Sequence, residues 1–141
     1  MPDNPLRELA DRLQRMREMA LATAVDISVE LQGEMRANAS WRDRFGHARN
    51  GLQARALPGQ SGSLLVTIIC SHSVDYGVYL ENPRKAYTVR PVRAKALKIP
   101  GIGYRKSAHI PARGNIYAVI RPTIERNLDR IGDEFRRSLL P

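Results

Sequence analysis

The first part of the chain carries apolar residues at spacings of three and four, the period of an amphipathic helix. Over residues 5–36 this stripe consists of Leu6, Leu9, Leu13, Met16, Ala20, Ala24, Ile27, Leu31 and Met35. Asn4 suits the N-cap and Pro5 the first helical position. A helix of about 32 residues is about 48 Å long, more than a domain of this size covers by itself. We therefore expect the helix to bend, to break near residues 26–28, or to pack partly on another subunit.

The next segment predicts a second helix, a strand and a short third helix. Ser40 is a candidate cap for a helix to about Ala54, in which Trp41, Phe45, Ala48 and Leu52 would share one face, and Pro58-Gly59 predicts a turn. The β-branched run SLLVTIICS, residues 63–71, is typical of a strand. The segment VDYGVYLEN, residues 74–82, favours a short helix.

The remaining segments predict a hairpin, a loop and a C-terminal helix. Residues 86–92 alternate as a strand does, and residues 96–99 are the expected partner strand. Residues 100–114 contain several Pro and Gly, which predicts an extended or mobile loop. A helix is predicted from Pro122 to about Leu139, with the stripe Ile124, Leu128, Ile131, Phe135 and Leu139.

The predicted elements together indicate one α+β domain over residues 1–141. It would contain a long N-terminal helix (5–36), a segment of helix, strand and short helix (40–82), a basic hairpin and loop (83–114) and a C-terminal helix (115–141). The small sheet is expected to be mainly antiparallel.

Charge changes this picture because it is concentrated in one segment. The chain of 141 residues has a net charge of +9, from 23 Lys and Arg and 14 Asp and Glu. No acidic residue lies between Glu81 and Glu125, an interval that contains the basic residues Arg84, Lys85, Arg90, Arg93, Lys95, Lys98, Arg105, Lys106, Arg113 and Arg121. Such a segment can attract a polyanion over about 8 Å at physiological salt.

Three interpretations of the basic segment remain open from the residues alone. It can be a solvated loop, it can dock on an acidic protein surface, or it can face nucleic acid without reading sequence. Tyr87 and Tyr104 lie among the cations and could stack on bases. We treat Arg84, Lys85, Arg90, Arg93, Lys95, Lys98, Arg105, Lys106 and Arg113 as the candidate functional residues.

Catalytic chemistry has weak support in the sequence. His47, His72 and His109 lie on three separate segments, and no Cys or His pair has metal-ligand spacing. Ser71-His72-Ser73 lacks an orienting carboxylate, and nothing marks Asp75 and Glu81 as an acid/base pair. We expect no enzyme activity, no metal and no cofactor.

The compartment is predicted from the same residues. Cys70 is the single cysteine, which excludes an intramolecular disulfide. No apolar run is long enough for a membrane helix, and the N-terminus does not resemble a secretory signal. These features suit a protein of the cytosol, or one assembled there.

Three stretches resemble, in the same order, motifs of the tail-completion or head–tail joining proteins of long-tailed bacteriophages. They are WRDRFGHARNGL (41–52), HSVDYGVYLEN (72–82) and YAVIRPTIERNLDRIGDEF (117–135). The hairpin YTVRP to KALKIPG and the later HIPARG are similar to a strand and turn of that family. The resemblance covers residues 40–135, and the N-terminal helix matches only as a pattern.

This resemblance implies a structural protein of the virion neck, assembled in the host cytoplasm. It would form a homo-oligomeric ring, usually sixfold, between the head-tail connector and the tail tube, with double-stranded DNA passing through the centre. The basic residues would face that DNA or contact the neighbouring connector ring. Alternatives are a tail terminator or head-closure protein of the same neck, or a small basic nucleic-acid-binding protein of a different class.

Ring assembly would also explain the length of the first helix. Each subunit of a head-to-tail ring needs two different contact surfaces. The candidate contact residues are Leu6, Leu9, Leu13 and Met16, together with Trp41 and Phe45. Trp41 can instead be an ordinary core residue.

Overall fold

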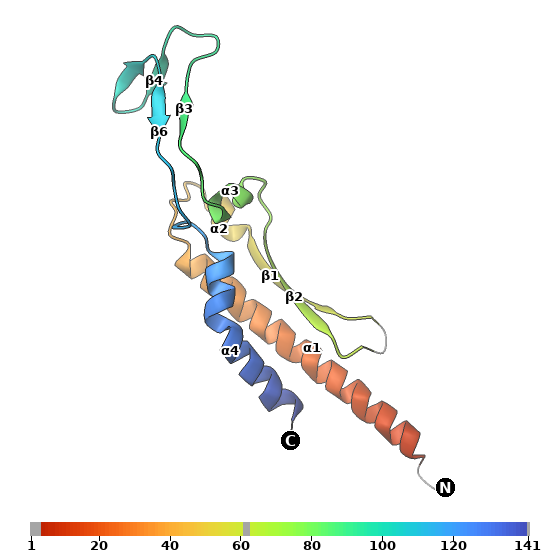
Figure 1. Cartoon of the computed structure of the whole chain (residues 1–141). Coiled ribbons are helices and arrows are strands. Elements are labelled where there is room, and N and C mark those ends of the chain that lie inside the picture. Colours follow the sequence, from red (N-terminus) through yellow and green to blue (C-terminus); the bar gives the residue numbers. More distant parts are fainter. Residues whose placement is uncertain (1–3, 61–62, 141) are drawn as a thin grey trace.

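The chain folds into an elongated body with a narrow arm that projects from one end (Figure 1). A computed structural model describes residues 4–60 and 63–140. The body contains α1 (Pro5–Asn38), α2 (His47–Asn50), β1 (Leu52–Pro58), β2 (Val66–His72), α3 (Gly77–Glu81) and α4 (Ile120–Leu139). The arm, residues 83–114, contains β3 (Tyr87–Val89), β4 (Leu97–Ile99), β5 (Gly103–Arg105) and β6 (Ala108–Ile110). The predicted α+β architecture with long first and last helices is confirmed.

Helix α1 begins and continues as its sequence predicts. The side chain of Asn4 accepts a hydrogen bond from the backbone N–H of Leu6 at 3.1 Å, and Pro5 occupies the first turn. The helix does not break near residues 26–28, where the Ser28 hydroxyl donates to the carbonyl of Val25 at 2.7 Å. A continuous helix therefore spans the length of the body and extends beyond it (Figure 1).

The core lies along the second half of α1, which contacts the β1–β2 hairpin and α4. Buried side chains from α1, from the segment after it, from β1 and from the start of α4 form one cluster, namely Ile27, Leu31, Met35, Ala39, Trp41, Ala48, Leu52, Ala54 and Val119. Ion pairs connect α4 to α1, between Arg126 and Glu34 at 3.1 Å and between Arg130 and Glu30. The Glu30 carboxylate, and to a smaller extent that of Glu134, raises the pKa of Arg130, so this cation stays charged.

Strands β1 and β2 form an antiparallel pair in which Leu52 faces His72 and Ala54 faces Cys70. Side chains of α1 seal the outer edge of β1. The Gln32 side-chain oxygen accepts from the Ala54 N–H at 3.1 Å, and the Arg36 guanidinium donates to the Leu52 carbonyl at 3.0 Å. The Ala54 N–H points away from β2, so Ala54 and Cys70 form a non-hydrogen-bonded pair of the antiparallel ladder. The backbone N–H of Cys70 therefore points away from β1. Among the described residues β2 pairs only with β1, so its outer edge has no strand beside it.

The predicted helix over residues 40–54 is wrong. Only α2 is helical there, and β1 begins at Leu52. Gly46 has a φ of +77°, which interrupts a right-handed helix. The segment LQARAL alternates apolar and polar residues, the period of a strand. The Ser40 hydroxyl caps no helix but donates to the carbonyl of Ile116 at 3.0 Å.

The predicted strand pairing in the arm is also wrong. Strand β3 pairs with β6, and β4 pairs with β5. Residues 100–114 therefore contain two short strands where a loop was expected. Gly101 and Gly103 have φ values of +80° and +101°, which allow the tight turn between β4 and β5.

Three other elements match their predictions with shifted ends. Strand β2 begins at Val66, not at residue 63, and α3 occupies residues 77–81 of the predicted 74–82. Helix α4 begins at Ile120, so Pro122 lies in its first turn, where a proline costs no helical hydrogen bond.

Candidate functional site: the basic arm

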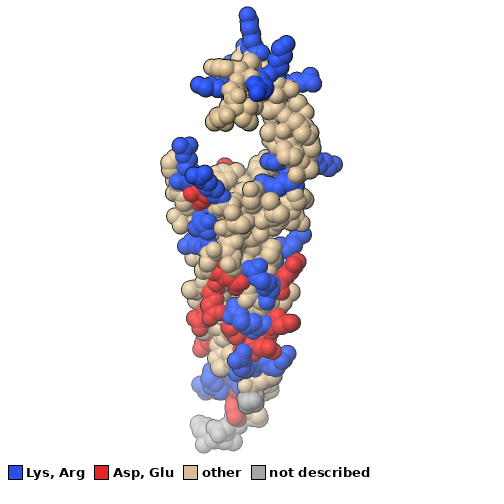
Figure 2. Space-filling model, turned by 90° about the vertical axis from the view of Figure 1, so that its left-hand side faces the viewer, with Lys and Arg blue, Asp and Glu red and all other residues tan. Residues whose placement is uncertain are grey.

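The arm exposes positive charge without balancing negative charge. Eight of the nine predicted basic residues are exposed, and we call these the arm cations: Arg84, Lys85, Arg90, Arg93, Lys95, Lys98, Arg105 and Lys106. No carboxylate among the described residues lies within ion-pair distance of any of them. Figure 2 shows Lys and Arg side chains around the far end of the arm, whereas the body displays both signs of charge. The arm is thus a separate cationic surface.

Arg113, the ninth predicted residue, has a different position. It is half-buried at the base of the arm, where its guanidinium donates to the carbonyls of Tyr79 and Asn82 and lies 4.8 Å from the centre of the Tyr117 ring. Its backbone N–H donates to the carbonyl of Arg84 at 2.8 Å, and Arg84 returns a bond of 2.7 Å. Arg113 therefore fastens the arm to the body and is not available to a ligand.

The arm has a thin apolar interior. Val89, Leu97, Ile99, Ala108 and Ile110 are half-buried, and the strands that carry them each span three residues. Two-stranded pairs of this length are marginal in water by themselves. The direction in which the arm projects therefore depends on the contacts at its base, the Arg84–Arg113 bridge and the bonds from Arg113 to the body.

Aromatic side chains lie among the arm cations. Tyr87 is 47% exposed and Tyr104 is 67% exposed. Tyr104 is the register partner of Lys98, so the two side chains stand on the same face of the β4–β5 hairpin. Arg84 lies 5.6 Å from the centre of the Tyr87 ring. In such a pair the cation can contact a phosphate and the tyrosine ring can stack on an exposed base. Neither contact depends on which base is present, so these pairs would not select a nucleotide sequence.

The resemblance motifs map to residues that hold the fold. In the first motif, the Asp43 carboxylate accepts from the N–H groups of Arg49 at 2.8 Å and Gly46 at 3.0 Å. The Arg49 N–H, followed by the neighbouring amides and the Arg49 guanidinium, lowers the pKa of Asp43. The Arg49 guanidinium donates to the carbonyls of Arg36, in the last turn of α1, and of Ala39, just after the helix, and it lies 5.4 Å from the centre of the Trp41 ring.

The second motif contains Glu81, which caps a helix distant in sequence. Its Oε1 accepts from the N–H groups of Val119 at 2.8 Å and Ile120 at 3.1 Å, and its Oε2 accepts from Ile120 at 3.2 Å. Helix α4 has no cap from its own N-cap residue, Val119. A carboxylate at this end is also favoured by the helix dipole. Sequence reasoning missed this role, since nothing near Val119 predicts it.

Glu81 also meets His72, whose Nε2 lies 3.4 Å from its Oε1. Sequence reasoning found no carboxylate to orient His72 and did not pair it with Glu81, whereas the structure brings these two residues together. The carboxylate is nevertheless occupied by the amides of α4, while Asp75 is exposed. The contact is accounted for by helix capping.

The predicted subunit-contact residues differ in how far they are exposed. Leu6, Leu9 and Leu13 are exposed at 74%, 53% and 41%, and Met16 is half-buried. Phe45 is 77% exposed, whereas Trp41 is 5% exposed and lies in the core. Trp41 is therefore a core residue and not part of an exposed contact surface.

Three further findings bear on function. Within residues 4–60 and 63–140, no group of three or more His, Cys, Asp or Glu side chains could hold a metal ion. No helix in this described part combines the length and apolar character that crossing a membrane requires. Comparison of the chain with family models, with curated proteins and with solved structures found no match.

Proposed function

We propose that this chain is a structural subunit of a bacteriophage neck, a tail-completion or head–tail joining protein that forms a ring around passing DNA. Two lines of reasoning support it. The three motifs resembling that family occur in its order, and the arm presents cations that no carboxylate of the described chain neutralises. The exposed, acid-free arm is the observation that carries the proposal.

The chemistry of the arm suits a channel that DNA must pass. Lys and Arg on exposed, short strands attract phosphates through charge and keep their hydration. They supply attraction without the fixed, bidentate geometry that retains a particular base sequence. A ring lined with such arms would hold DNA loosely and still release it.

The arm has a second use in the same setting, since it could grip the connector ring beside it. A tail terminator or a head-closure protein would need similar contacts. All of these assignments share a ring of identical subunits, so the ring is the property to test first.

A second candidate is a basic nucleic-acid-binding protein that acts as a monomer or dimer. The exposure of Tyr87 and Tyr104 among the arm cations favours it, because stacking on bases requires unpaired, accessible rings. This candidate predicts tight binding to single strands and no ring.

The experiment combines negative-stain microscopy with mass measurement in solution, on the full chain at increasing concentration and with tail-tube or connector protein added. Rings of uniform size, alone or on addition of a neck partner, support the proposal. A chain that stays monomeric or dimeric under all these conditions, and binds free nucleic acid, contradicts it and favours the second candidate.

A further inference from the structure

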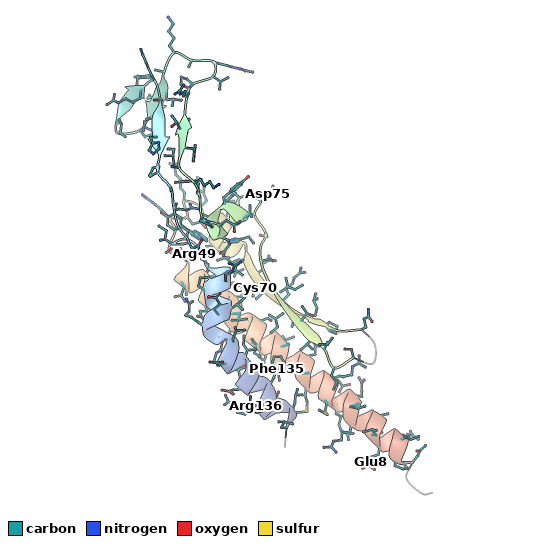
Figure 3. The ribbon with its side chains drawn as sticks, viewed as in Figure 1. Glu8, Arg49, Cys70, Asp75, Phe135 and Arg136 are labelled. Carbon is teal, nitrogen blue, oxygen red and sulfur yellow. The ribbon has the colours of Figure 1, made fainter. Side chains whose placement is uncertain are left out.

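An apolar groove runs along the body between β2 and α4. Its floor is Leu31 of α1, one wall contains Ile68 and Cys70 of β2, and the other contains Ile124, Ile131 and Phe135 of α4. Cys70 and Phe135 are labelled in Figure 3. Apart from Leu31, these side chains are only half-buried. Since the outer edge of β2 is also open, this side of the body lacks a covering layer.

A second apolar surface lies at the other end of α1. The helix extends past the body toward its N-terminus (Figure 1), and the stripe of Leu6, Leu9 and Leu13 is exposed there. We call this the α1 stripe. A contiguous row of exposed leucines on a helix is typical of a contact surface.

The two surfaces match in length. Extended by one turn to the half-buried Met16, the α1 stripe spans about 15 Å from Leu6, and from Ile124 to Phe135 the α4 wall spans about 17 Å at about 1.5 Å per residue. A helix laid in the groove would place its leucines along the whole wall.

Their charges also match. Glu125 directly follows Ile124 of the groove wall, and Asp129 lies one turn further along α4; both are exposed, and neither has an ion-pair partner among the described residues. Arg12 and Arg17 flank the α1 stripe, and neither contacts a described carboxylate. Opposite charges at the rim of an apolar contact favour one orientation.

We propose that the α1 stripe of one copy of this chain docks in the apolar groove of the next copy. The inference deepens the proposed ring and rests on it for the closing of the assembly, because two different surfaces on each chain give a head-to-tail contact. The contact would cover the leucines of α1 and the open side of β2 and α4 together.

The single cysteine makes the contact directly testable. Cys70 lies in the wall of the groove, and a chain carrying Leu13→Cys with Cys70→Ser has its only thiol on the α1 stripe. Mixing this variant with the native chain and adding a short bis-maleimide can join position 13 to Cys70 only between molecules. Reaction at pH 8 is appropriate, since burial raises the pKa of the Cys70 thiol. The matched control is Arg15→Cys with Cys70→Ser, because Arg15 lies on the opposite face of the same turn.

The expected result is a dimer band from the Leu13→Cys mixture at least tenfold stronger than from the Arg15→Cys mixture. Thermal melting of both variants checks that the exposed substitutions leave the fold intact. Rings with equal, weak cross-linking from both positions would overturn the groove contact and leave the neck ring standing. Strong linkage at position 13 in open chains or dimers, without rings, would uphold the contact and contradict the neck ring. No association and no linkage, either alone or with a neck partner added, would overturn both.

Discussion

Replacing Glu81 with alanine removes the only side-chain cap that the structure gives to α4. Its two oxygens accept from the N–H groups of Val119 and Ile120 at 2.8 to 3.2 Å, and Val119 is 3% exposed. A net hydrogen bond to a charged group contributes about 1.5–3 kcal/mol, and loss of an N-cap costs about 0.5–2 kcal/mol. Since the carboxylate is 18% exposed and water can partly replace it, we expect a loss of about 2–4 kcal/mol.

The assay is urea unfolding at fixed protein concentration, because self-association would add to the apparent stability. With a slope of about 2 kcal/mol per molar urea, the midpoint should fall by about 1–2 M. Glu81→Gln keeps an oxygen that can accept from both amides, so its loss should be about half as large. Glu125→Ala is the matched control: it removes an exposed carboxylate from α4, the helix that Glu81 caps, and should change stability by less than about 0.5 kcal/mol. If Glu81→Ala behaves like this control, the capping role is refuted.

Three further predictions concern the first motif, α3 and the arm. Asp43→Asn should lower the urea midpoint at neutral pH. The folded pKa of Asp43 lies below its ordinary value of 3.8, so the stability that its carboxylate adds over Asn is present above that value and should shrink as the pH falls through the folded pKa. A series of urea midpoints for both proteins from pH 7 to pH 2.5 measures this. Gly77→Ala should cost about 1–3 kcal/mol by overpacking, since the new Cβ would lie 2.3 Å from the Cβ of His72, whereas Gly33→Ala, with open space around it, should stabilise by about 0.5–1 kcal/mol; equal midpoints would contradict the packing of α3. Replacing the six arm cations beyond residue 89 by Gln should reduce the slope of log binding constant against log salt concentration for duplex DNA by about 3, if half of the six each neutralise one phosphate at a slope of about 0.9 per phosphate. Fluorescence anisotropy measures the slope, with Arg136→Gln/Arg137→Gln as the control. An unchanged slope would show that the arm does not bind DNA.

The elements that sequence predicts well are those with a long, regular period. Helix α1 repeats its stripe over many turns, and α4 repeats it over a shorter span, so local pattern and tertiary packing agree. The helix expected over residues 40–54 failed because Trp41, Phe45, Ala48 and Leu52 have helical spacing by coincidence. Leu52 belongs to an alternating strand, and Phe45 is exposed.

The strand pairing in the arm and the roles of Arg113 and Glu81 could not be predicted, for a different reason. Strands of three residues carry too little periodicity to select a partner, so the pairing of β3 with β6 depends on the whole arm. Charge alone grouped Arg113 with the exposed cations, because its carbonyl partners at Tyr79 and Asn82 leave no signal in composition. Glu81 is separated by 38 residues from the amide of Val119 that it caps.

The side chains of Gln32 and Arg36 make the β1–β2 pair one-sided. A strand is added more easily beside β2, because the Leu52 carbonyl and the Ala54 N–H at the outer margin of β1 are already bonded to side chains of α1. Sheets that grow into fibrils need two receptive margins, one for each incoming neighbour. At high concentration, accidental pairing of this hairpin is therefore expected beside β2 rather than beside the Leu52–Ala54 part of β1.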